Sequence, residues 1–325
     1  MSPIQVAVLG ECVADAFPSG SPELGQLALR VLPGGGPANT AVALARLGSP
    51  TRFVGRISRD AFGALFRARL HASGVDVTGC VSAAEPSTLA VATLDGAGQA
   101  GYSFHAEGTA DWQWTAAELT PDRLGVAACV HTGSLALVRS PGAERIEELL
   151  ASVRDRMTVS IDPNVRAGLV DPAVYPRRMP RWCALADVVK LSDDDLKHLD
   201  SGRSLEEACD AWHAAGVRLA VVTRGAQGAV VSVDGERVRV PAPSVEVVDT
   251  VGAGDSFTAG LLHHLGEHGL LGGRLGTLDL ERAVEASAFA ARVAALTCSV
   301  PGADPPWARD LAGAEPVPAP APGAA

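Results

Sequence analysis

The sequence lacks several features that would assign it to other classes of protein. Of its 325 residues only two are lysines, Lys190 and Lys197. Neither follows a glycine, which excludes the Walker A phosphate-binding loop, G-x-x-x-x-G-K-[ST]. No run of about 18 apolar residues is present, so we expect no membrane span. The first five residues lack the basic start of a secretory signal peptide, and we therefore expect a cytoplasmic protein.

Basic side chains are scarce relative to acidic ones. The chain has 27 lysines and arginines against 37 aspartates and glutamates, a formal net charge of −10. Nucleic-acid-binding proteins rely on basic patches, so we expect no nucleic-acid partner. The six cysteines show no C-x-x-C spacing, and a chain of this length does not need disulfides to fold. We expect reduced cysteines, most of them in the core.

Two short motifs match known site patterns but lack the context that those sites require. Residues 96–101 fit G-x-G-x-x-G, yet Tyr102 to Phe104 then favour a strand, where a dinucleotide site needs a helix. We predict a hairpin turn there. Residues 264–268 fit the H-x-x-E-H pattern of a zinc peptidase. Gly266 and Gly269 indicate a fraying helix end, so a zinc peptidase is a remote alternative that metal analysis would test.

Short apolar runs alternate with helical patterns along most of the chain. This rhythm predicts an α/β fold with a mostly parallel sheet covered by helices on both faces. Ligands of such sheets bind at the carboxyl ends of the strands, where Asp162, Lys190 and Thr223 fall. The expected strands are residues 6–10, 127–130, 158–162, 188–191 and 219–223, and helical stretches include 143–155 and 204–215.

A glycine-rich turn near the C-terminus leads directly into a helical pattern. Gly252, Ala253 and Gly254 precede Asp255. Glycine lets the backbone approach a ligand closely, and the first N–H groups of a helix attract anions such as phosphate. A carboxylate beside that anion is well placed to accept a proton from an attacking hydroxyl. The segment is also typical of a plain turn with an Asp N-cap.

A second glycine-rich segment lies near the N-terminus. Gly34, Gly35 and Gly36 precede a helical pattern that contains Asn39 and ends at Gly48. Three consecutive glycines exceed what a turn needs and suggest a close backbone approach. Asn39 offers both a donor and an acceptor, as a sugar hydroxyl requires. The alternative is a flexible loop with Asn39 on the first helical turn.

Together the two segments resemble the two signatures of the ribokinase-like (PfkB-type) carbohydrate kinases. The resemblance runs from Gly10 to about Pro306 and within the family is greatest to bacterial fructokinases. It implies a three-layer sandwich with a small β-sheet lid, formed by antiparallel strands within residues about 12–33 and 88–106. The kinase domain would span residues 1–313, with a disordered Pro/Ala-rich tail over 314–325. Relatives often form homodimers through the lid.

The resemblance also implies roles for individual residues. Asp255 would be the general base, the N–H groups of Gly252, Ala253 and Gly254 would bind the γ-phosphoryl oxygens, and Arg166 would lie near the sugar and the transferred phosphate. A surface-loop arginine is the alternative for Arg166. The sugar-binding residues implied are Asp15, Gly35, Gly36, Asn39 and Phe104; for Asp15 the alternative is a surface turn.

For the nucleotide, the resemblance implies Lys190, Ser192, Thr223, Gly225, Gly228 and Ala291. Many relatives show N-x-x-E where this chain has Ser192 and Asp195, so Asp195 would order magnesium-bound water. The shorter aspartate leaves open that ATP phosphates and water hold the Mg²⁺ instead. Asp249 and the carbonyl of Val251 would bind a monovalent cation such as K⁺, or Asp249 would only orient its loop.

The activity implied is ATP-dependent phosphorylation of a hexose hydroxyl, with D-fructose converted to fructose 6-phosphate. The near alternative is another sugar kinase acting on 2-keto-3-deoxygluconate, ribose or a nucleoside. From a different class, a non-catalytic nucleotide or sugar sensor would bind without forming ADP. The intact Gly252-Ala253-Gly254-Asp255 argues against a sensor, because pure binding gains nothing from a base.

Overall fold

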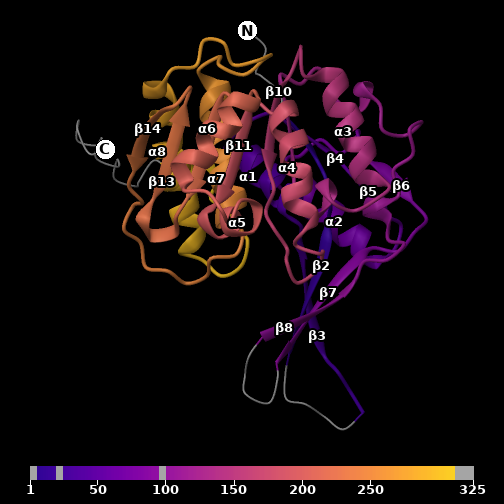
Figure 1. Ribbon diagram of the computed structural model, residues 1–325. Coiled ribbons are helices and arrows are strands. Elements are labelled where there is room, and N and C mark those ends of the chain that lie inside the picture. Colours follow the sequence, from indigo (N-terminus) through magenta and orange to yellow (C-terminus); the bar gives the residue numbers. More distant parts are fainter. Residues whose placement is uncertain (1–5, 20–24, 95–99, 312–325) are drawn as a thin grey trace.

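The computed structural model describes residues 6–19, 25–94 and 100–311, with an eight-stranded sheet at its centre (Figure 1). Its order is β14-β13-β12-β11-β10-β9-β1-β4, and only β13 and β14 run antiparallel to their neighbours. The predicted mostly parallel sheet is therefore confirmed. Its strands are β1 (Val6–Leu9), β4 (Thr51–Val54), β9 (Cys129–Gly133), β10 (Thr158–Asp162), β11 (Val188–Ser192), β12 (Leu219–Thr223), β13 (Ala229–Val233) and β14 (Glu236–Val240).

Helices cover both faces of this sheet and form two hydrophobic cores. Along each buried strand successive side chains point to opposite faces, so Val6 and Val8 join one core while Ala7 and Leu9 join the other. One face carries α1 (Gly36–Arg46), α2 (Ala61–Ala72), α7 (Ala253–Glu267) and α8 (Leu280–Cys298); the other carries α3 (Gly142–Val153), α4 (Val174–Leu185), α5 (Asp193–Leu199) and α6 (Leu205–Ala215). The three-layer sandwich is confirmed.

The predicted elements agree closely with those observed, apart from one strand. Strands β10 and β12 coincide with their predicted ranges, and α6 begins after Ser204, which forms a capping box with Glu207. Strand β9 runs to Gly133 rather than ending at Val130. Its later residues are polar but buried, and the His131 ring is within 3.0 Å of the Ser160 hydroxyl. Pairing with β10 therefore outweighs the loss of apolar character.

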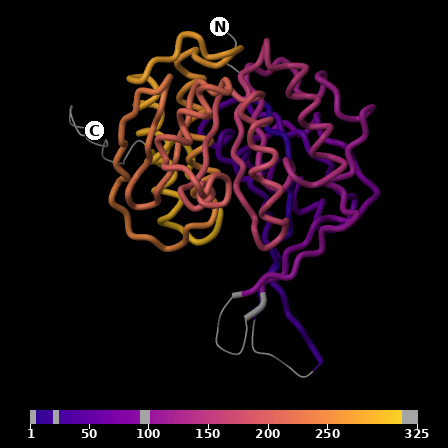
Figure 2. The backbone as a smooth tube through the Cα atoms, in the orientation of Figure 1, coloured from indigo at the N-terminus to yellow at the C-terminus, as the bar shows by residue number. Residues whose placement is uncertain are grey.

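A separate four-stranded sheet extends from the body and forms the lid (Figure 2). Its order is β3-β2-β7-β8, and its strands come from the two segments that were expected to form the lid. The expected antiparallel pairing occurs within each segment, and in addition β2 and β7 pair in parallel. They come from separate segments and are not joined by a hairpin. The lid strands are β2 (Val13–Pro18), β3 (Leu29–Gly34), β7 (Thr88–Leu94) and β8 (Ala100–His105).

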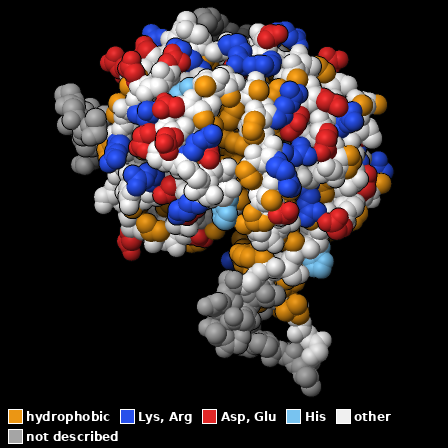
Figure 3. All heavy atoms as spheres, viewed as in Figure 1, with side chains coloured by type: hydrophobic (Ala, Val, Ile, Leu, Met, Phe, Trp, Pro, Cys, Tyr) orange, Lys and Arg blue, Asp and Glu red, His pale blue; other side chains and the backbone are white. Residues whose placement is uncertain are grey.

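The remaining elements are short. They are β5 (Arg56–Ser58), β6 (Val81–Ala83), the 3-10 turns η1 (Ala110–Trp112), η2 (Pro121–Leu124), η3 (Ser134–Leu137) and η4 (Gly225–Gln227), and α9 (Ala308–Leu311). Within the described ranges, no helix combines the length and apolarity needed to cross a bilayer. Figure 3 shows acidic and basic side chains interspersed over the viewed face of the body. All six cysteines are free, and four of them are buried.

The structure bears differently on the predictions for the two short motifs, G-x-G-x-x-G and H-x-x-E-H, and for the tail. Residues 96–99 lie outside the described residues, but β7 and β8 on either side pair antiparallel, so a strand follows the glycines. The H-x-x-E-H pattern lies at the end of α7, where the His264 and His268 rings stack 4.1 Å apart. No cluster of three His, Cys, Asp or Glu suited to a metal occurs among the described residues. The predicted tail, 314–325, lies beyond them.

Candidate active site

The C-terminal glycine-rich segment forms the N-terminus of α7. Gly252 is its N-cap and adopts a left-handed conformation with φ 78°, which glycine tolerates best. Within the described chain, the N–H groups of Gly252 and Gly254 have no hydrogen-bond acceptor. The sequence predicted that the Ala253 N–H also binds phosphate, but it donates to the Thr250 carbonyl at 3.2 Å. The corner thus presents free backbone donors at the positive end of a 15-residue helix.

The N-terminal glycine-rich segment packs directly against this corner. The Asn39 side chain, on the first turns of α1, donates from Nδ2 to Oδ2 of Asp255 at 2.9 Å. A Cβ at Gly36 would lie 3.2 Å from Oδ1 of Asp255 and 3.0 Å from the side-chain nitrogen of Asn164. The structure therefore brings Gly36 and Asn39 together with Asp255, which lies more than 200 residues further along the sequence. Oδ1 of Asp255 accepts no hydrogen bond from the described residues and faces this space.

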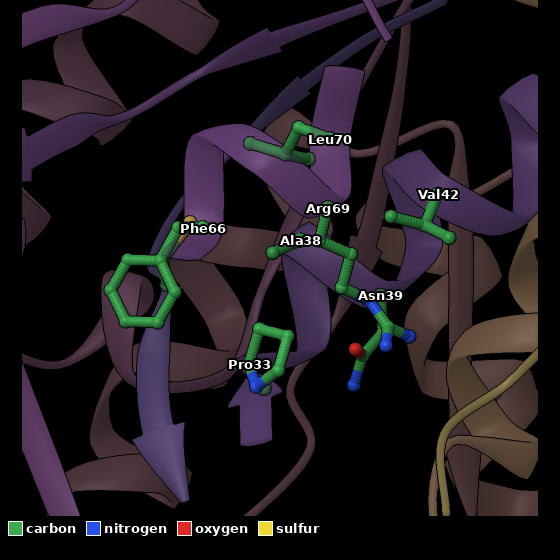
Figure 4. Close-up of a pocket in the computed structure, with 9 residues that line it drawn as sticks. Pro33, Ala38, Asn39, Val42, Phe66, Arg69 and Leu70 are labelled. Atoms are coloured by element: carbon green, nitrogen blue, oxygen red, sulfur yellow. The ribbon is translucent and has the colours of Figure 1, made fainter. Parts of the chain in front are cut away.

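A narrow pocket lies behind the N-terminal loop, between β3, α1 and α2 (Figure 4). Asn39 and Arg69 both line it. At Gly35, with φ 100°, a Cβ would lie 2.6 Å from the carbonyl oxygen of Glu11. A side chain at this position would clash with fixed backbone, so glycine is needed for the close approach that the sequence predicted.

Electrostatics at Asp255 suit a general base. Burial raises the pKa of this carboxyl, and the nearby Asp162 carboxylate raises it further. The Asn39 hydrogen bond and the positive charges of Lys190 and Arg166 act in the opposite direction. A base is most effective when its pKa lies near the working pH. Asp255 is thus a stronger base than a solvent-exposed aspartate.

Asp15 and Arg166 approach the same site from the lid and from the loop after β10. Burial raises the pKa of both Asp15 and Asp255, and the positive charge of Arg166 opposes this rise at each. Burial is the larger effect on Asp15 and raises its pKa to about 6. A Cβ at Gly34 would lie only 2.0 Å from Oδ2 of Asp15, so the carboxylate rests against the glycine loop. The surface-turn alternative for Asp15 is not supported.

Asp195 holds the loop that carries Arg166. Its Oδ2 accepts hydrogen bonds from the Ser192 backbone N–H (3.0 Å) and hydroxyl (2.7 Å), and its Oδ1 accepts the Val165 N–H at 2.8 Å. A carboxylate offers about four acceptor positions, so one on Oδ1 stays free for a water molecule. The sequence did not predict this support of the Arg166 loop.

Lys190 lies beneath the glycine corner rather than in the open cleft. Its Nζ donates to Oδ2 of Asp162 at 2.8 Å and to the Gly254 carbonyl at 3.2 Å. Lysine has three donors, so one proton stays available for a phosphate. Asp162 is the last residue of β10, whereas Lys190 lies in the middle of the adjacent strand β11 and not, as the sequence predicted, at its end. The ion pair between them supports the phosphate-binding turn through the Gly254 carbonyl.

The predicted nucleotide residues are partly brought together. Ser192 and Thr223 lie opposite each other where β11 and β12 end. A Cβ at Gly228 would lie 2.0 Å from the Val240 carbonyl, so this glycine is required by the β13–β14 hairpin. Gly225 begins η4 in open space with φ 52°. Ala291 is almost fully buried in the core on α8, and its contact with a nucleotide stays a prediction.

Asp249 and Phe104 complete the predicted set. The two carboxylate oxygens of Asp249 accept the N–H groups of Val251 (3.0 Å) and Gly302 (2.8 Å), which leaves acceptor positions on both. Phe104 on β8 pairs with Ala90, which in turn pairs with Asp15. Directly paired residues share a face of the sheet, so Phe104 and Asp15 lie on the same face of the lid.

Glu11 is a buried carboxyl near the site that sequence reasoning did not single out. It is 1% exposed, and its Oε2 accepts the Ala136 N–H at 3.2 Å. Burial raises its pKa to about 7, from an ordinary value of 4.5, against the lowering effect of a hydrogen bond from Ser134. The sequence offered only Gly10-Glu11 at a strand end, which carries no signal for a protonated acid.

We predict that Glu11→Gln stabilises the protein above neutral pH. A raised folded-state pKa means that the folded state binds the proton more tightly, so stability falls as pH rises from about 4.5 through about 7. The amide removes this loss, which is worth roughly 3 kcal/mol at pH 8. Chemical denaturation at pH 8 and pH 5 checks this. If the substitution changed the free energy of unfolding equally at pH 5 and pH 8, the prediction that Glu11 is protonated in the folded protein would be contradicted.

Comparison with known proteins decides the family. The model described as "pfkB family carbohydrate kinase" matches residues 4–309. The chain belongs to the pfkB family of carbohydrate kinases. It is 39% identical over 263 residues to a fructokinase of Rhizobium leguminosarum bv. trifolii, covering 81% of this chain and 80% of that protein. A fructokinase of Klebsiella pneumoniae is 35% identical over 270 residues, or 82% and 86% of the two chains.

Solved structures agree with this pfkB family assignment. The fructokinase of Xylella fastidiosa with bound ATP superposes with a TM-score of 0.83 at 28% identity, covering 92% of this chain and 93% of that one. The fructokinase of Vibrio cholerae O395, in a form with bound fructose, ADP and calcium ion, gives a TM-score of 0.74 at 27% identity, covering 93% and 95%. The ribokinase-like fold expected from the two glycine-rich signatures is confirmed.

Proposed function

We propose that this pfkB family protein transfers the γ-phosphoryl group of ATP to a hydroxyl of fructose, forming fructose 6-phosphate. The observation that carries the proposal is the placement of Oδ1 of Asp255. Among the described residues this oxygen accepts no hydrogen bond, and the N–H groups of Gly252 and Gly254 at the same helix terminus are unpaired, with Gly36 leaving room for a substrate. A base and an anion-binding corner on one helix terminus are what phosphoryl transfer to an alcohol needs.

Each residue of the site has a distinct task in this proposal. Asp15 and the Gly35–Gly36 backbone orient the sugar, with Phe104 on the same face of the lid. Asp255 accepts the proton of the attacking hydroxyl while Asn39 fixes the carboxylate through Oδ2. Free N–H groups of the corner stabilise negative charge on the transferred phosphoryl group, and they are preorganised because the helix holds them. Arg166 adds a planar cation suited to phosphate.

The nucleotide would lie along the ends of β11 and β12. Ser192, Thr223 and Gly225 line that edge, and Lys190 offers its third proton from below. A divalent ion neutralises phosphate charge in such reactions. Among the described residues, no cluster of carboxylates could ligate Mg²⁺ directly. The free hydrogen-bond acceptor position on Asp195 fits a water molecule bound to the metal. The free acceptor positions of Asp249 and the Val251 carbonyl fit a hard monovalent cation such as K⁺.

A coupled assay of ADP release tests the function directly. Fructose, ribose, 2-keto-3-deoxygluconate and adenosine are compared as acceptors, with an assay lacking acceptor as the control for ATP hydrolysis. We expect the highest kcat/KM with fructose. A higher value for another acceptor would reassign the substrate within the family. Nucleotide binding by calorimetry without ADP release for any acceptor would indicate a sensor.

We predict that sugar affinity depends on pH through Asp15. The pKa of this carboxyl is raised to about 6, mainly by burial, so the carboxylate is lost as pH falls through about 6. The KM for fructose should then rise about tenfold or more, because a hydrogen bond to a charged group is worth about 1.5–3 kcal/mol. Steady-state kinetics from pH 5 to 8 measure this. Asp15→Asn should show a high KM for fructose that does not depend on pH in this range. If the KM of the variant changed with pH as that of the wild type does, Asp15 would not be the residue that binds the sugar.

A further inference from the structure

The segment that follows α8 crosses back over the active-site corner. We call residues 302–307 the strap. Its Gly302 N–H donates to Oδ2 of Asp249 at 2.8 Å. A Cβ added to Gly252 would lie 2.7 Å from Cβ and 3.0 Å from Cα of Ala303. The strap therefore packs directly on the left-handed N-cap of α7 and bonds to the loop before it.

The other end of the strap is anchored to α1 and α2 by two arginines. Arg46, the last residue of α1, donates through Nη1 to Oδ1 of Asp304 at 2.6 Å and to the Pro305 carbonyl at 2.7 Å. Its guanidinium also lies 5.1 Å from the ring centroid of Trp307, within the range of a cation–π contact. Arg69 of α2 donates to the Ala303 carbonyl. These bonds hold the strap at three successive residues and at its end.

Helix α1 connects the strap to Asp255, because its two ends contact one each. Its first turns carry Gly36 and Asn39, and Asn39 holds Asp255 on α7. Its last residue, Arg46, holds the strap, which holds Gly252 at the start of α7. Eleven helical residues span about 16 Å as a stiff element. Thus α1 fixes the base through one end and the N-cap of the phosphate-binding corner through the other.

We propose that the strap is a positioning element for phosphoryl transfer, and that Arg46 and Trp307 are positioning residues that act through Gly252. This inference rests on the proposed kinase function for its effect on turnover. Donors of an anion-binding corner stabilise the transition state only if they are held in place beforehand. A displacement of about 1 Å costs up to about 10²-fold in rate. The strap supplies that restraint at Gly252.

Steady-state kinetics of Trp307→Ala and Arg46→Gln test the proposal. We expect kcat to fall between about 10- and 100-fold, with the KM for fructose within about twofold of the wild-type value, because the sugar residues are not touched. Trp307→Phe keeps a ring face beneath Arg46 and should recover most of the loss. Arg309→Ala is the matched control. Its guanidinium lies 5.4 Å from the same ring centroid, but within the described residues its ion pair is with the neighbouring Asp310. It therefore does not link the strap to α1, and normal turnover is expected.

A second measurement separates this proposal from the proposed function. Hydrogen exchange of the peptide covering residues 249–257 is followed in the protein without substrates. We expect at least tenfold faster exchange in Trp307→Ala and Arg46→Gln, and wild-type exchange in Arg309→Ala. If the wild-type protein phosphorylates no sugar, the function fails while this measurement still decides on the strap. Wild-type exchange and turnover in either folded variant, Trp307→Ala or Arg46→Gln, would overturn the proposal.

Discussion

Replacing Asp255 by asparagine is expected to lower kcat by about 10²–10⁴-fold, the usual contribution of a positioned base. This corresponds to about 3–5 kcal/mol of activation free energy. The amide has almost the same shape, and its oxygen can still accept the hydrogen bond from Asn39 that now reaches Oδ2 at 2.9 Å. We therefore expect the affinities for fructose and ATP to stay within a few fold of wild type.

The control for this variant is Asp194→Asn. Asp194 lies on the first turn of α5, and its side chain is 81% exposed. Its only hydrogen-bond or ion-pair partner in the described structure is Lys197, which is 70% exposed. The same chemical change there should leave turnover unchanged. Near-normal turnover of Asp255→Asn, with the control also active, would show that Asp255 does not take the proton of the attacking hydroxyl.

Local patterns were sufficient to predict the fold and the two glycine-rich corners. Strand β12 is apolar up to its last residue, Thr223, and α6 carries its capping residues in sequence, so propensity and packing agree there. The bounds of strand β9 were predicted wrongly, and the parallel pairing of β2 with β7 was not predicted. Both depend on partners that are distant in sequence, and no local periodicity encodes them.

The site was predicted as a set of residue types, but several of their interactions were not. Asn39 was expected to bind the sugar, and the structure shows that it also holds Asp255. Lys190 was expected at the nucleotide, and its first partner is Asp162. Asp195 was expected near a metal, and it supports the Val165–Arg166 loop. These pairings depend on which strand ends become neighbours, so they follow from topology rather than from any single motif.

The buried ion pair beneath the corner leads to the second large effect, on stability. In the pair of Lys190 and Asp162 the side chains are only 4% and 8% exposed. Lys190→Met keeps the aliphatic length but leaves the Asp162 carboxylate buried without its cation. Removing one partner of a buried pair typically costs about 3–5 kcal/mol. We expect a loss of this size in chemical denaturation at pH 8. Turnover should fall as well, because the Gly254 carbonyl loses the Lys190 donor and, among the described residues, keeps only the Thr258 hydroxyl as a side-chain donor.

A matched lysine and a double variant make this prediction specific. Lys197→Met removes the other lysine of the chain, which forms an exposed pair with Asp194, and should not change stability measurably. Replacing both members of the buried pair, as in Lys190→Met with Asp162→Leu, should recover much of the stability but none of the turnover. If the single Lys190→Met variant is as stable as wild type at pH 8, then the ion pair does not stabilise the fold, and Lys190 serves the phosphate alone.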